Sequence, residues 1–508
     1  MPTRAGRPRS GGSTAGVIAA RTLTNNSIHD FIIVEYNGHL GGRVAHSTFG
    51  KKPDGTPYTV ELGANWVQGL GSPGGPENPI WTLAKEFQLA NTYSNYSSIL
   101  SYDATGYVDY TEFINEIEDA WGTLEQDAGY ILSENLQDRS IRSGFSVAGW
   151  RPGVQQMRKQ AAEWWEWDWE YAYPPEETSQ VFGIVNYNAT FYHFSDANNY
   201  VFDQRGFNTF IKGEASKFLS DNDPRLLLNT VVRNITYSDT GVTIHNTDGT
   251  CISAAHSVCT FSLGVLQHAP ASVSFHPPLP AWKVAAIDSF QMGTYTKNFL
   301  QFNHTFWPTD TEFFLYADPI ERGYYPVFQS LSTPGFLPES NIIFATVVQR
   351  QSQRAERMSD EEVRGEVVAV LRTMFPHVVV PEPTAFLMPR WSSEPWAYGS
   401  YSNWPPGTSL EGHQNLRANV GALWFAGEAT SAEDFGFLQG AYFEGRAVAE
   451  RVVACLRAKA MGVGGSGCPR EERYEVLRGV TPVGQYDEAN GWMVGFLDEL
   501  CGMVMLMS

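Results

Sequence analysis

The residues best suited to chemistry begin with a glycine-rich loop near the start of the chain. Gly11 and Gly16 enclose the stretch Gly-Gly-Ser-Thr-Ala-Gly, and an apolar helical pattern follows over residues 17–23. A loop of this kind presents backbone N–H groups and the positive end of a helix to a phosphate. Glu35 ends a short apolar strand pattern, 31–35, at the separation where an acid holds the ribose hydroxyls of a dinucleotide. Together these features favour a dinucleotide site.

The loop departs from the usual fingerprint in two ways. Ser13 occupies the position of the middle glycine, and residues 1–10 are basic and rich in proline and glycine, not strand-like. An irregular start before an ordinary helix is therefore an alternative interpretation. A further hypothesis is that the natural protein begins upstream with an apolar strand. Residues 1–20 lack the apolar run of a signal peptide, so the compartment stays open, and secretion is compatible with an upstream start.

Two more segments carry residues suited to a charged cofactor. After the first strand pattern, Gly41 and Gly42 allow close approach of the backbone, and Arg43 can bind a phosphate with its forked guanidinium. Near the other end of the chain, Glu428 follows a buried strand pattern, and Gly436 precedes a helical pattern. The N-terminus of that helix can also bind an anionic group.

Acidic and aromatic residues alternate over 163–173, which reads E-W-W-E-W-D-W-E-Y-A-Y. Aromatic faces and carboxylates both attract cations, although a tryptophan-rich packing face of a helix explains most of this stretch. The whole chain has a formal net charge of -20, which argues against nucleic acid as a partner and is compatible with cationic small molecules. Much of that charge is explained by solubility alone.

Composition limits the remaining possibilities. With 508 residues, 43% of them hydrophobic, the chain predicts a globular protein of two or three domains. Five cysteines without a C-x-x-C pair predict neither a structural zinc site nor a disulfide framework. No uncharged apolar stretch is long enough to predict a membrane span.

The elements that must position these residues alternate between strand and helix patterns at both ends of the chain. Strands are predicted at 31–35, within 225–262, and at 296–303, 342–348 and 422–426; helices at 17–23, within 108–170, near 360–374 and at 438–460. Residues 53–79 are rich in glycine, proline and asparagine and are expected to be largely irregular. This layout predicts a nucleotide-binding domain assembled from separated segments, with a second domain built from the insertions between them.

Several motifs in sequence order resemble the flavin-containing amine oxidase family, in particular its polyamine oxidase-like branch. They are E-Y-N-G-H-L-G-G-R at 35–43, E-L-G-A-N-W-V-Q-G at 61–69, Y-T-K-N-F at 295–299, R-W-S-S-E-P-W at 390–396, G-S-Y-S-N-W at 399–404, G-E-A-T-S at 427–431 and F-G-F-L-Q-G-A-Y at 435–442. The resemblance covers roughly residues 11–455.

The resemblance implies an α/β plus α+β fold, with a Rossmann-like FAD-binding domain made of discontinuous segments. That domain is expected to comprise 11–95, 211–275 and 396–460, and the substrate-binding domain 96–210 and 276–395. Residues 1–10 are expected to be an irregular start, and 461–508 a C-terminal extension that begins with a Gly/Ser-rich stretch.

The resemblance also assigns roles to individual residues. The expected cofactor-binding residues are Gly11, Gly16, Glu35, Arg43, Val67, Val232, Trp391, Glu428, Phe437 and Leu438. Lys297 would bond a water beside flavin N5, Tyr401 and Phe437 would enclose the substrate amine, and Glu170 would be the acid of the substrate tunnel. Gln68 departs from the plant-type pattern, which has a glutamate there, and this puts the affinity for long polyamines in doubt.

The implied reaction is FAD-dependent oxidation of polyamines or related amines without a metal. Hydride passes to flavin N5, and dioxygen reoxidises the cofactor to give hydrogen peroxide, an aldehyde and an amine. An L-amino acid or monoamine oxidase is one alternative, and an inactive remnant without an intact FAD cradle is another. The expected partners are a small-molecule amine and dioxygen, and the chain is expected to be a monomer or weak dimer.

Overall fold

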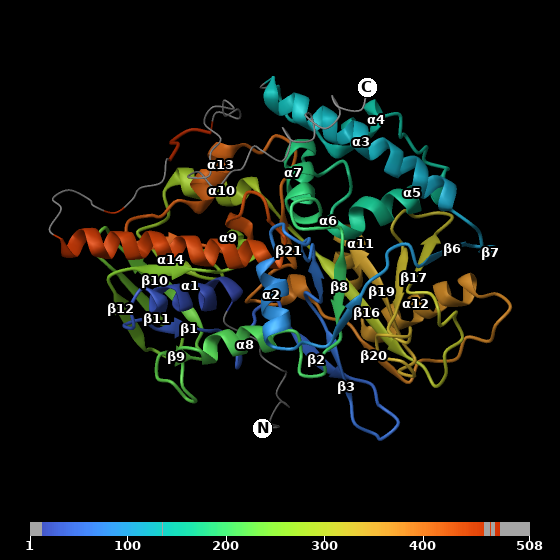
Figure 1. Cartoon of the computed structure of the whole chain (residues 1–508), viewed down its shortest axis with the longest axis horizontal. Coiled ribbons are helices and arrows are strands. Elements are labelled where there is room, and N and C mark those ends of the chain that lie inside the picture. Colours follow the sequence, from blue (N-terminus) through green and yellow to red (C-terminus); the bar gives the residue numbers. More distant parts are fainter. Residues whose placement is uncertain (1–12, 135, 462–467, 469–472, 478–508) are drawn as a thin grey trace.

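The computed structural model describes residues 13–134, 136–461, 468 and 473–477 (Figure 1). Gly11, residues 1–10, where an irregular start was expected, and most of the expected C-terminal extension lie outside these residues. The described chain combines parallel strand pairs, antiparallel sheets and helical layers, as predicted for an α/β plus α+β fold. The limits of the two expected domains stay a prediction.

One group of elements comes from the two ends of the chain and from residues 209–276 between them. They are α1 (Thr14–Asn25), β1 (Ile33–Val34), β2 (His46–Phe49), β3 (Tyr58–Glu61), β4 (Trp66–Gln68), α2 (Pro79–Glu86), α8 (Thr209–Ser216), β9 (Leu226–Leu227), β10 (Val232–Tyr237), β11 (Val242–Asn246), β12 (Cys251–Ala254), β13 (Ser257–Cys259), α9 (Leu263–Gln267), β14 (Ser274–His276), α13 (Leu410–Arg417), β22 (Leu423–Phe425), the 3-10 turn η3 (Glu428–Thr430) and α14 (Leu438–Ala460). Strands β1 and β9 pair in parallel, as do β13 and β22. Helix α1 packs directly on α14. Gly445 allows this close approach, because a Cβ at that position would lie 2.4 Å from the backbone oxygen of Ala15.

The remaining elements form a large sheet, a helical layer and strands of two smaller sheets. They are β5 (Asn91–Tyr93), β6 (Ile99–Asp103), β7 (Gly106–Tyr107), α3 (Thr111–Ser133), α4 (Ile141–Val147), α5 (Met157–Glu163), the π-helix η1 (Trp164–Asp168), α6 (Trp169–Tyr171), α7 (Gln180–Phe191), β8 (Asn198–Val201), α10 (Ala281–Ser289), β15 (Gln291–Gly293), β16 (Tyr295–Gln301), β17 (Phe313–Ala317), β18 (Val327–Ser330), β19 (Ile342–Val348), α11 (Gln349–Arg357), α12 (Asp360–Met374), β20 (Ala385–Leu387), the 3-10 turn η2 (Trp391–Ser393) and β21 (Tyr401–Asn403).

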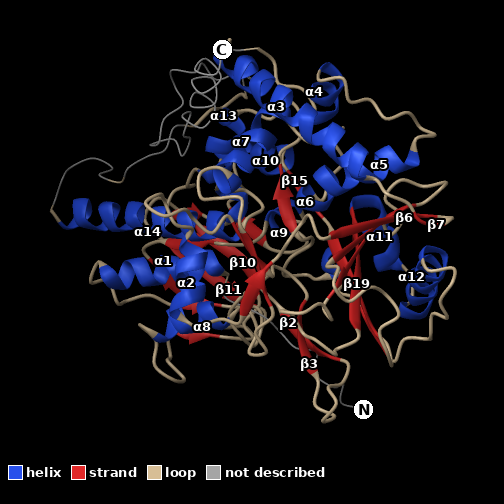
Figure 2. Cartoon of the chain, turned by 45° about the vertical axis from the view of Figure 1, so that its right-hand side comes forward, coloured by secondary structure: helices blue, strands red, loops and turns tan. Residues whose placement is uncertain are grey.

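The seven-stranded sheet has the order β20-β16-β19-β18-β17-β6-β7 and lies on the opposite side of the molecule from α1 and α14 (Figure 1). Every residue of β19 is buried, because helices and loops cover both faces of the sheet. Val367 and Leu371 of α12 pack on it within one apolar cluster. Helices α3, α4 and α5 gather along one side of the molecule (Figure 2). Strand β16, which carries Lys297, is held between β19 and β20 in this sheet.

Residues 53–79 are largely irregular, as expected, and they also contain the short strands β3 and β4 and the first residue of α2. One expectation needs correction. A disulfide framework was not predicted, yet Cys455 on α14 is bonded to Cys468. The two cysteines are 13 positions apart, one on a helix and one beyond its end. This spacing alone does not distinguish a disulfide from two free thiols. In the part of the chain that the structure describes, no helix has the length and apolar character needed to cross a membrane.

Candidate active site

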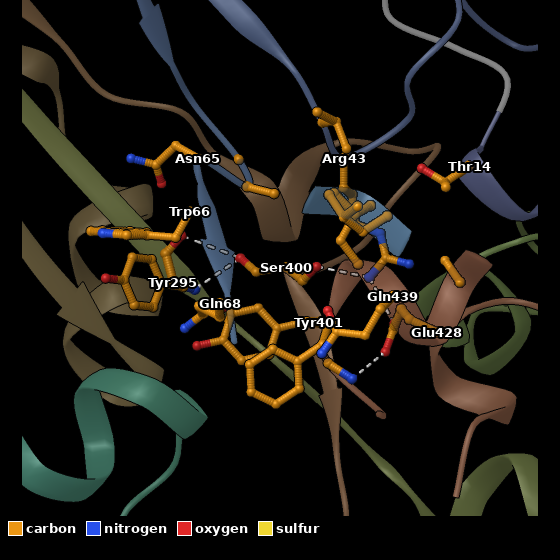
Figure 3. A pocket seen from close by; sticks show the side chains of 18 of the residues that line it. Thr14, Arg43, Asn65, Trp66, Gln68, Tyr295, Ser400, Tyr401, Glu428 and Gln439 are labelled. Atoms are coloured by element: carbon orange, nitrogen blue, oxygen red, sulfur yellow. Dashed lines mark hydrogen bonds and ion pairs between the residues drawn. The ribbon is translucent and has the colours of Figure 1, made fainter. Parts of the chain in front are cut away.

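A cavity runs between the N-terminus of α1 and the seven-stranded sheet. Its lining joins segments that are hundreds of residues apart in sequence, and Figure 3 shows ten of the lining residues labelled. Thr14, Arg43 and Glu428 lie at one end, and Trp66, Gln68 and Tyr295 lie at the other. The first end carries groups suited to phosphate, and the second carries aromatic rings and the amide of Gln68.

The phosphate-like end begins at α1. Ser13 is the N-cap residue: its Oγ accepts the backbone N–H of Gly16 at 3.1 Å and donates to Thr260 Oγ1 at 2.8 Å. Thr14 and Ala15 line the cavity, so the positive end of a twelve-residue helix faces it. Serine at the middle position of the loop thus serves as a helix cap, which is one of the roles that serine fills best.

Arg43 and Glu428 form one unit on the wall. Arg43 Nη1 donates to Glu428 Oε1 and to the carbonyl of Ser400, both at 2.8 Å. The second oxygen, Glu428 Oε2, accepts the hydroxyl of Ser402 at 2.5 Å and the backbone N–H of Gly436 at 2.8 Å. The glutamate therefore fixes the guanidinium and the turn before α14 at the same time.

The structure does not bring every expected cofactor residue into this cavity. Val67, Trp391, Phe437 and Leu438 line it together with Arg43 and Glu428. Glu35, Val232 and Gly16 are not in the lining: Glu35 Oε1 accepts the backbone N–H of Asn37 at 2.7 Å, and Val232 lies at the start of β10. Gly16 instead sits within α1, close to Ser13 and Thr260. Gly11 lies outside the described residues.

Lys297 is 1% exposed on β16. Its Nζ donates to the carbonyl of Gly63 at 2.7 Å and to Asn65 Oδ1, and it lies 5.4 Å from the centre of the Trp66 ring. Burial lowers the pKa of Lys297 to about 7, while the charge of Glu61 acts in the opposite direction. Lys297 can therefore gain or lose a proton near neutral pH at a wall of the cavity.

Glu170 faces the same cavity from α6. Its Oε1 accepts Gln68 Nε2 at 2.7 Å, and its backbone carbonyl accepts the hydroxyl of Tyr401 at 2.7 Å. Burial raises the pKa of Glu170 to about 7, and the hydrogen bond from Gln68 acts against this rise. The cavity thus contains a carboxyl group that ionises near neutrality, held in place by the amide of Gln68, the position at which this chain departs from the plant-type pattern.

The aromatic residues around Glu170 form a continuous wall. Trp66 packs edge-on against Trp169 at 5.6 Å between ring centroids, and Tyr96 packs against Trp169 at 5.1 Å. Tyr295 and Tyr401 lie 6.1 Å apart, and all five residues line the cavity. Such rings suit the apolar carbon chain and the positive charge of an alkylammonium.

Two other acids of the 163–173 stretch, Glu163 and Asp168, have structural partners. Arg322 binds both Glu163 and Asp168, and Arg142 also binds Glu163. The alternative interpretation of this stretch as a packing helix therefore holds for most of its residues. Among the described residues, no group of three or more potential ligands is arranged to hold a metal ion.

Several lining residues were not singled out from the sequence, among them Tyr96, Asn186 and Ser400. Tyr96 lies in a turn that carries no motif, and Asn186 lies in a mostly apolar helix that has two other side-chain amides. Ser400 belongs to the G-S-Y-S-N-W motif. The motif indicated that this segment lies near the site, but not what Ser400 does there. Its carbonyl accepts from Arg43, and its hydroxyl accepts the backbone N–H of Tyr295 at 2.9 Å.

The residues present fit a flavin dinucleotide. The α1 N-terminus and Arg43 provide donors for a pyrophosphate, and a Cβ built on Gly427 meets no atom within 4 Å, so this wall is open toward a ligand. Farther along the cavity, Leu438 at the start of α14 and several aromatic rings form the wall. Such apolar surfaces suit a flat tricyclic ring.

Comparisons with known proteins agree with this geometry. The family model described as flavin containing amine oxidoreductase matches residues 14–453. Polyamine oxidase 1 of Zea mays is 36% identical over 466 residues, 88% of this chain and 90% of the relative. Polyamine oxidase 7 of Oryza sativa subsp. japonica is 36% identical over 87% of this chain and 94% of its own.

The fold also matches a solved structure, wild-type putrescine oxidase bound to putrescine. The TM-score is 0.67 at 17% identity, and the match covers 88% of this chain and 98% of that one. At this identity the likeness supports the fold alone, whereas the family model and the plant relatives cover nearly the whole described chain. The chain therefore belongs to the family of flavin containing amine oxidoreductases, and it is an enzyme that oxidises amines with FAD as its cofactor.

Proposed function

We propose that this protein oxidises polyamines or closely related amines, with dioxygen as the final electron acceptor and hydrogen peroxide, an aldehyde and an amine as products. The observation that carries the proposal is Glu170, a carboxyl group set among aromatic rings in the same cavity as the cofactor-binding residues. When bound, FAD supplies the two-electron oxidation of the carbon next to nitrogen and the reduction of dioxygen.

The protein's own residues orient the substrate. Above its pKa of about 7, Glu170 is an anion that attracts a substrate ammonium. Tyr401 is fixed by its hydrogen bond to the Glu170 carbonyl, so the ring and the charge keep a constant spacing. Phe437 caps the start of α14 and packs against Phe191 at 6.0 Å, which gives the cavity a second aromatic face. These contacts suit an alkyl chain with positive charge along it.

Lys297 supplies the wall of the site with an amino group whose protonation changes near neutral pH. Its pKa of about 7 allows Nζ to release or accept a proton during turnover at neutral pH. In its charged form it also stabilises negative charge that develops in the cavity. Because three carbonyl-type acceptors from residues 61–65 hold Nζ, the group is fixed in position.

At position 68 this cavity has a neutral amide and not a second acid beside Glu170. The amide holds Glu170 but adds no charge, so only one carboxylate acts on the substrate at this point. We expect weaker binding of long polyamines than two carboxylates would give. The same residue favours substrates in which one nitrogen near the reacting carbon is neutral, such as an N-acetylated amine.

The amino acid oxidase alternative finds no support in the cavity. Such an enzyme needs an arginine that is free to bind the substrate carboxylate. Among the described lining residues the only arginine is Arg43, and it lies at the phosphate-like end of the cavity, away from Trp66 and Tyr295. The aromatic and acidic surroundings instead suit a cation.

Visible absorption spectra test the proposal. The purified protein is expected to show flavin bands that bleach on anaerobic addition of spermine or N-acetylspermine. Bleaching by the N-acetylated amine at a lower concentration would support the role of Gln68. Flavin bands that respond to neither compound, but do respond to an L-amino acid, would overturn the substrate proposal. A colourless protein that takes up no added FAD would show that this chain is not active as written.

A further inference from the structure

Glu61 is a buried acid that the proposed mechanism does not use. It is the last residue of β3, it is 4% exposed, and it does not line the active-site cavity. Its Oε1 accepts the backbone N–H of Phe207 at 2.7 Å, whereas Oε2 is buried without a hydrogen bond in the structure. A carboxyl group in such surroundings is costly to ionise unless an opposite charge lies near it.

The nearby opposite charge is that of Lys297. Its Nζ donates to the backbone carbonyl of Glu61 at 3.3 Å, so the carboxyl group belongs to a residue that contacts the amine directly. The carbonyl of Gly63 and Oδ1 of Asn65 also accept from Nζ. An ammonium has one N–H for each of these acceptors, whereas a neutral amine would turn its lone pair toward one of them. The geometry therefore suits the charged form of Lys297.

Burial opposes the charged form of both residues. It lowers the pKa of Lys297 to about 7, and the charge of Glu61 acts in the opposite direction. Burial raises the pKa of Glu61 to about 7, and the N–H of Phe207 and then the charge of Lys297 act against that rise. The three acceptors around Nζ carry no net charge, so they do not replace a carboxylate as a source of negative potential.

Other ionisable groups lie around Glu61 on neighbouring elements. Lys212 on α8 favours the Glu61 carboxylate, and Asp203, just after β8, disfavours it. His46 is opposite Glu61 in the pairing of β2 with β3, and burial lowers its pKa to about 4, so it is neutral at pH 7. Of the acids described around this pair, Glu61 is the one whose charge acts on Lys297.

We propose that the Glu61 carboxylate is the counter-charge that keeps Lys297 protonated, and that it thereby sets the pH at which the cavity loses this positive charge. Glu61 acts through Lys297, because Glu61 itself does not line the cavity. The inference rests on the proposed function, in which charged Lys297 stabilises negative charge that develops in the site. Without the carboxylate, Lys297 becomes a neutral amine at a pH where the unaltered protein still has an ammonium.

Two substitutions separate the charge of Glu61 from its hydrogen bond. Glu61→Gln keeps an oxygen that can accept the N–H of Phe207 but removes the charge. Glu61→Asp keeps the charge but shortens the side chain, which weakens the bond to Phe207. A role as counter-charge predicts the larger effect on Lys297 in Glu61→Gln, whereas a purely structural role predicts the larger effect in Glu61→Asp.

The measurement is an NMR titration of full-length protein whose lysines carry an NMR-active carbon isotope at Cε, with and without bound FAD. The chemical shift of Cε follows the protonation of Nζ, and the signal that is absent from Lys297→Met belongs to Lys297. In Glu61→Gln the midpoint of this titration should fall by about one pH unit or more, because a nearby opposite charge raises the pKa of an amine by that amount. In Glu61→Asp it should stay close to that of the unaltered protein.

Glu312→Gln is the matched control. Glu312 is also a buried acid, 2% exposed, and burial raises its pKa to about 7. Its oxygens are bound by three neutral donors, and it does not line the cavity. The Lys297 midpoint should be unchanged in this variant. An unchanged midpoint in Glu61→Gln, or an equal fall in the two Glu61 variants, would overturn the role of the carboxylate.

The titration also separates this inference from the proposed function, because it needs no turnover. If Glu61→Gln gives no soluble protein, Glu61→Asp decides alone, and a midpoint about one pH unit lower in that variant would contradict the role of the charge. Oxidation of neither spermine nor N-acetylspermine by the unaltered protein would instead overturn the proposed function, whatever the midpoints are.

Discussion

Glu170 combines a raised pKa with a position inside the substrate cavity. Only its ionised form attracts an ammonium, and burial moves this ionisation to about pH 7. As pH falls through 7, Glu170 gains a proton and the affinity for a cationic amine decreases. We therefore expect KM for spermine to rise on the acid side of pH 7 in the unaltered protein.

The Glu170→Gln variant tests this assignment. It should raise KM about tenfold at pH 8, because a hydrogen bond to a charged group is lost, and it should remove the rise in KM below pH 7. Steady-state kinetics from pH 5.5 to about 9 measures both effects. Glu125→Gln is the control, since Glu125 is a buried acid on α3 that does not line the cavity. If KM for spermine still rises below pH 7 in the Glu170→Gln variant, a group other than Glu170 causes that rise.

Glu428 links two parts of the cofactor wall, so its charge should affect retention of FAD. The Glu428→Gln variant keeps the shape but loses the charge that holds Arg43 and accepts from Ser402 and Gly436. We expect the affinity for FAD to fall at least tenfold, in line with the loss of a charge-assisted hydrogen bond. Titration of the apoprotein with FAD, followed by flavin fluorescence, gives the two dissociation constants. Equal constants would mean that Arg43 keeps its position without the charge.

At the scale of elements, long periodic or apolar segments could be predicted from the sequence alone. The predicted spans 342–348 and 438–460 match β19 and α14 at both ends, because a buried apolar run and a long helix leave strong local patterns. Strands β3 and β4 were not predicted. They are short, and tertiary pairing with β2 and β8 decides their conformation, not local preference.

The loop after β3 shows why particular glycines matter. A Cβ at Gly63 would lie 1.8 Å from the carbonyl oxygen of Arg43, and Gly63 also accepts a hydrogen bond from Lys297. The Gly63→Ala variant should lose about 1–3 kcal/mol of unfolding free energy through this overlap of backbone and side chain. Denaturant unfolding of the apoprotein measures the change.

Gly122→Ala provides the control for that prediction. A Cβ at Gly122, within α3, meets no atom within 4 Å. Alanine should therefore stabilise the helix by up to about 1 kcal/mol. If Gly63→Ala were as stable as the unaltered protein, the segment around Arg43 would be able to move aside, and the close approach would not constrain the site.

At the scale of the whole molecule, the fold decides which predicted residues meet. Arg43, Lys297, Tyr401 and Glu428 come from distant parts of the chain and line one cavity. Their motifs were visible in the sequence because each has a distinctive local pattern. Asn186 has none: its amide binds the turn before α14, and that contact depends on where α7 packs. Spatial neighbours of this kind could not be predicted without a structure.

The net charge of the whole chain provides the last prediction. A formal charge of -20 creates a negative potential that attracts a polycation over distances comparable to the Debye length. Salt screens this attraction, so kcat/KM for spermine should fall several-fold between about 0.02 and 0.2 M salt. Stopped-flow reduction of the flavin at pH 8 in NaCl and in potassium acetate separates screening from binding of a particular ion.

Benzylamine, with at most one positive charge, should show a much smaller dependence in the same buffers. Because screening acts on encounter, the change should appear in kcat/KM while kcat at saturating spermine stays constant. Equal salt effects on the two amines would mean that the acidic surface serves solubility, and that attraction of the substrate arises only within the cavity around Glu170.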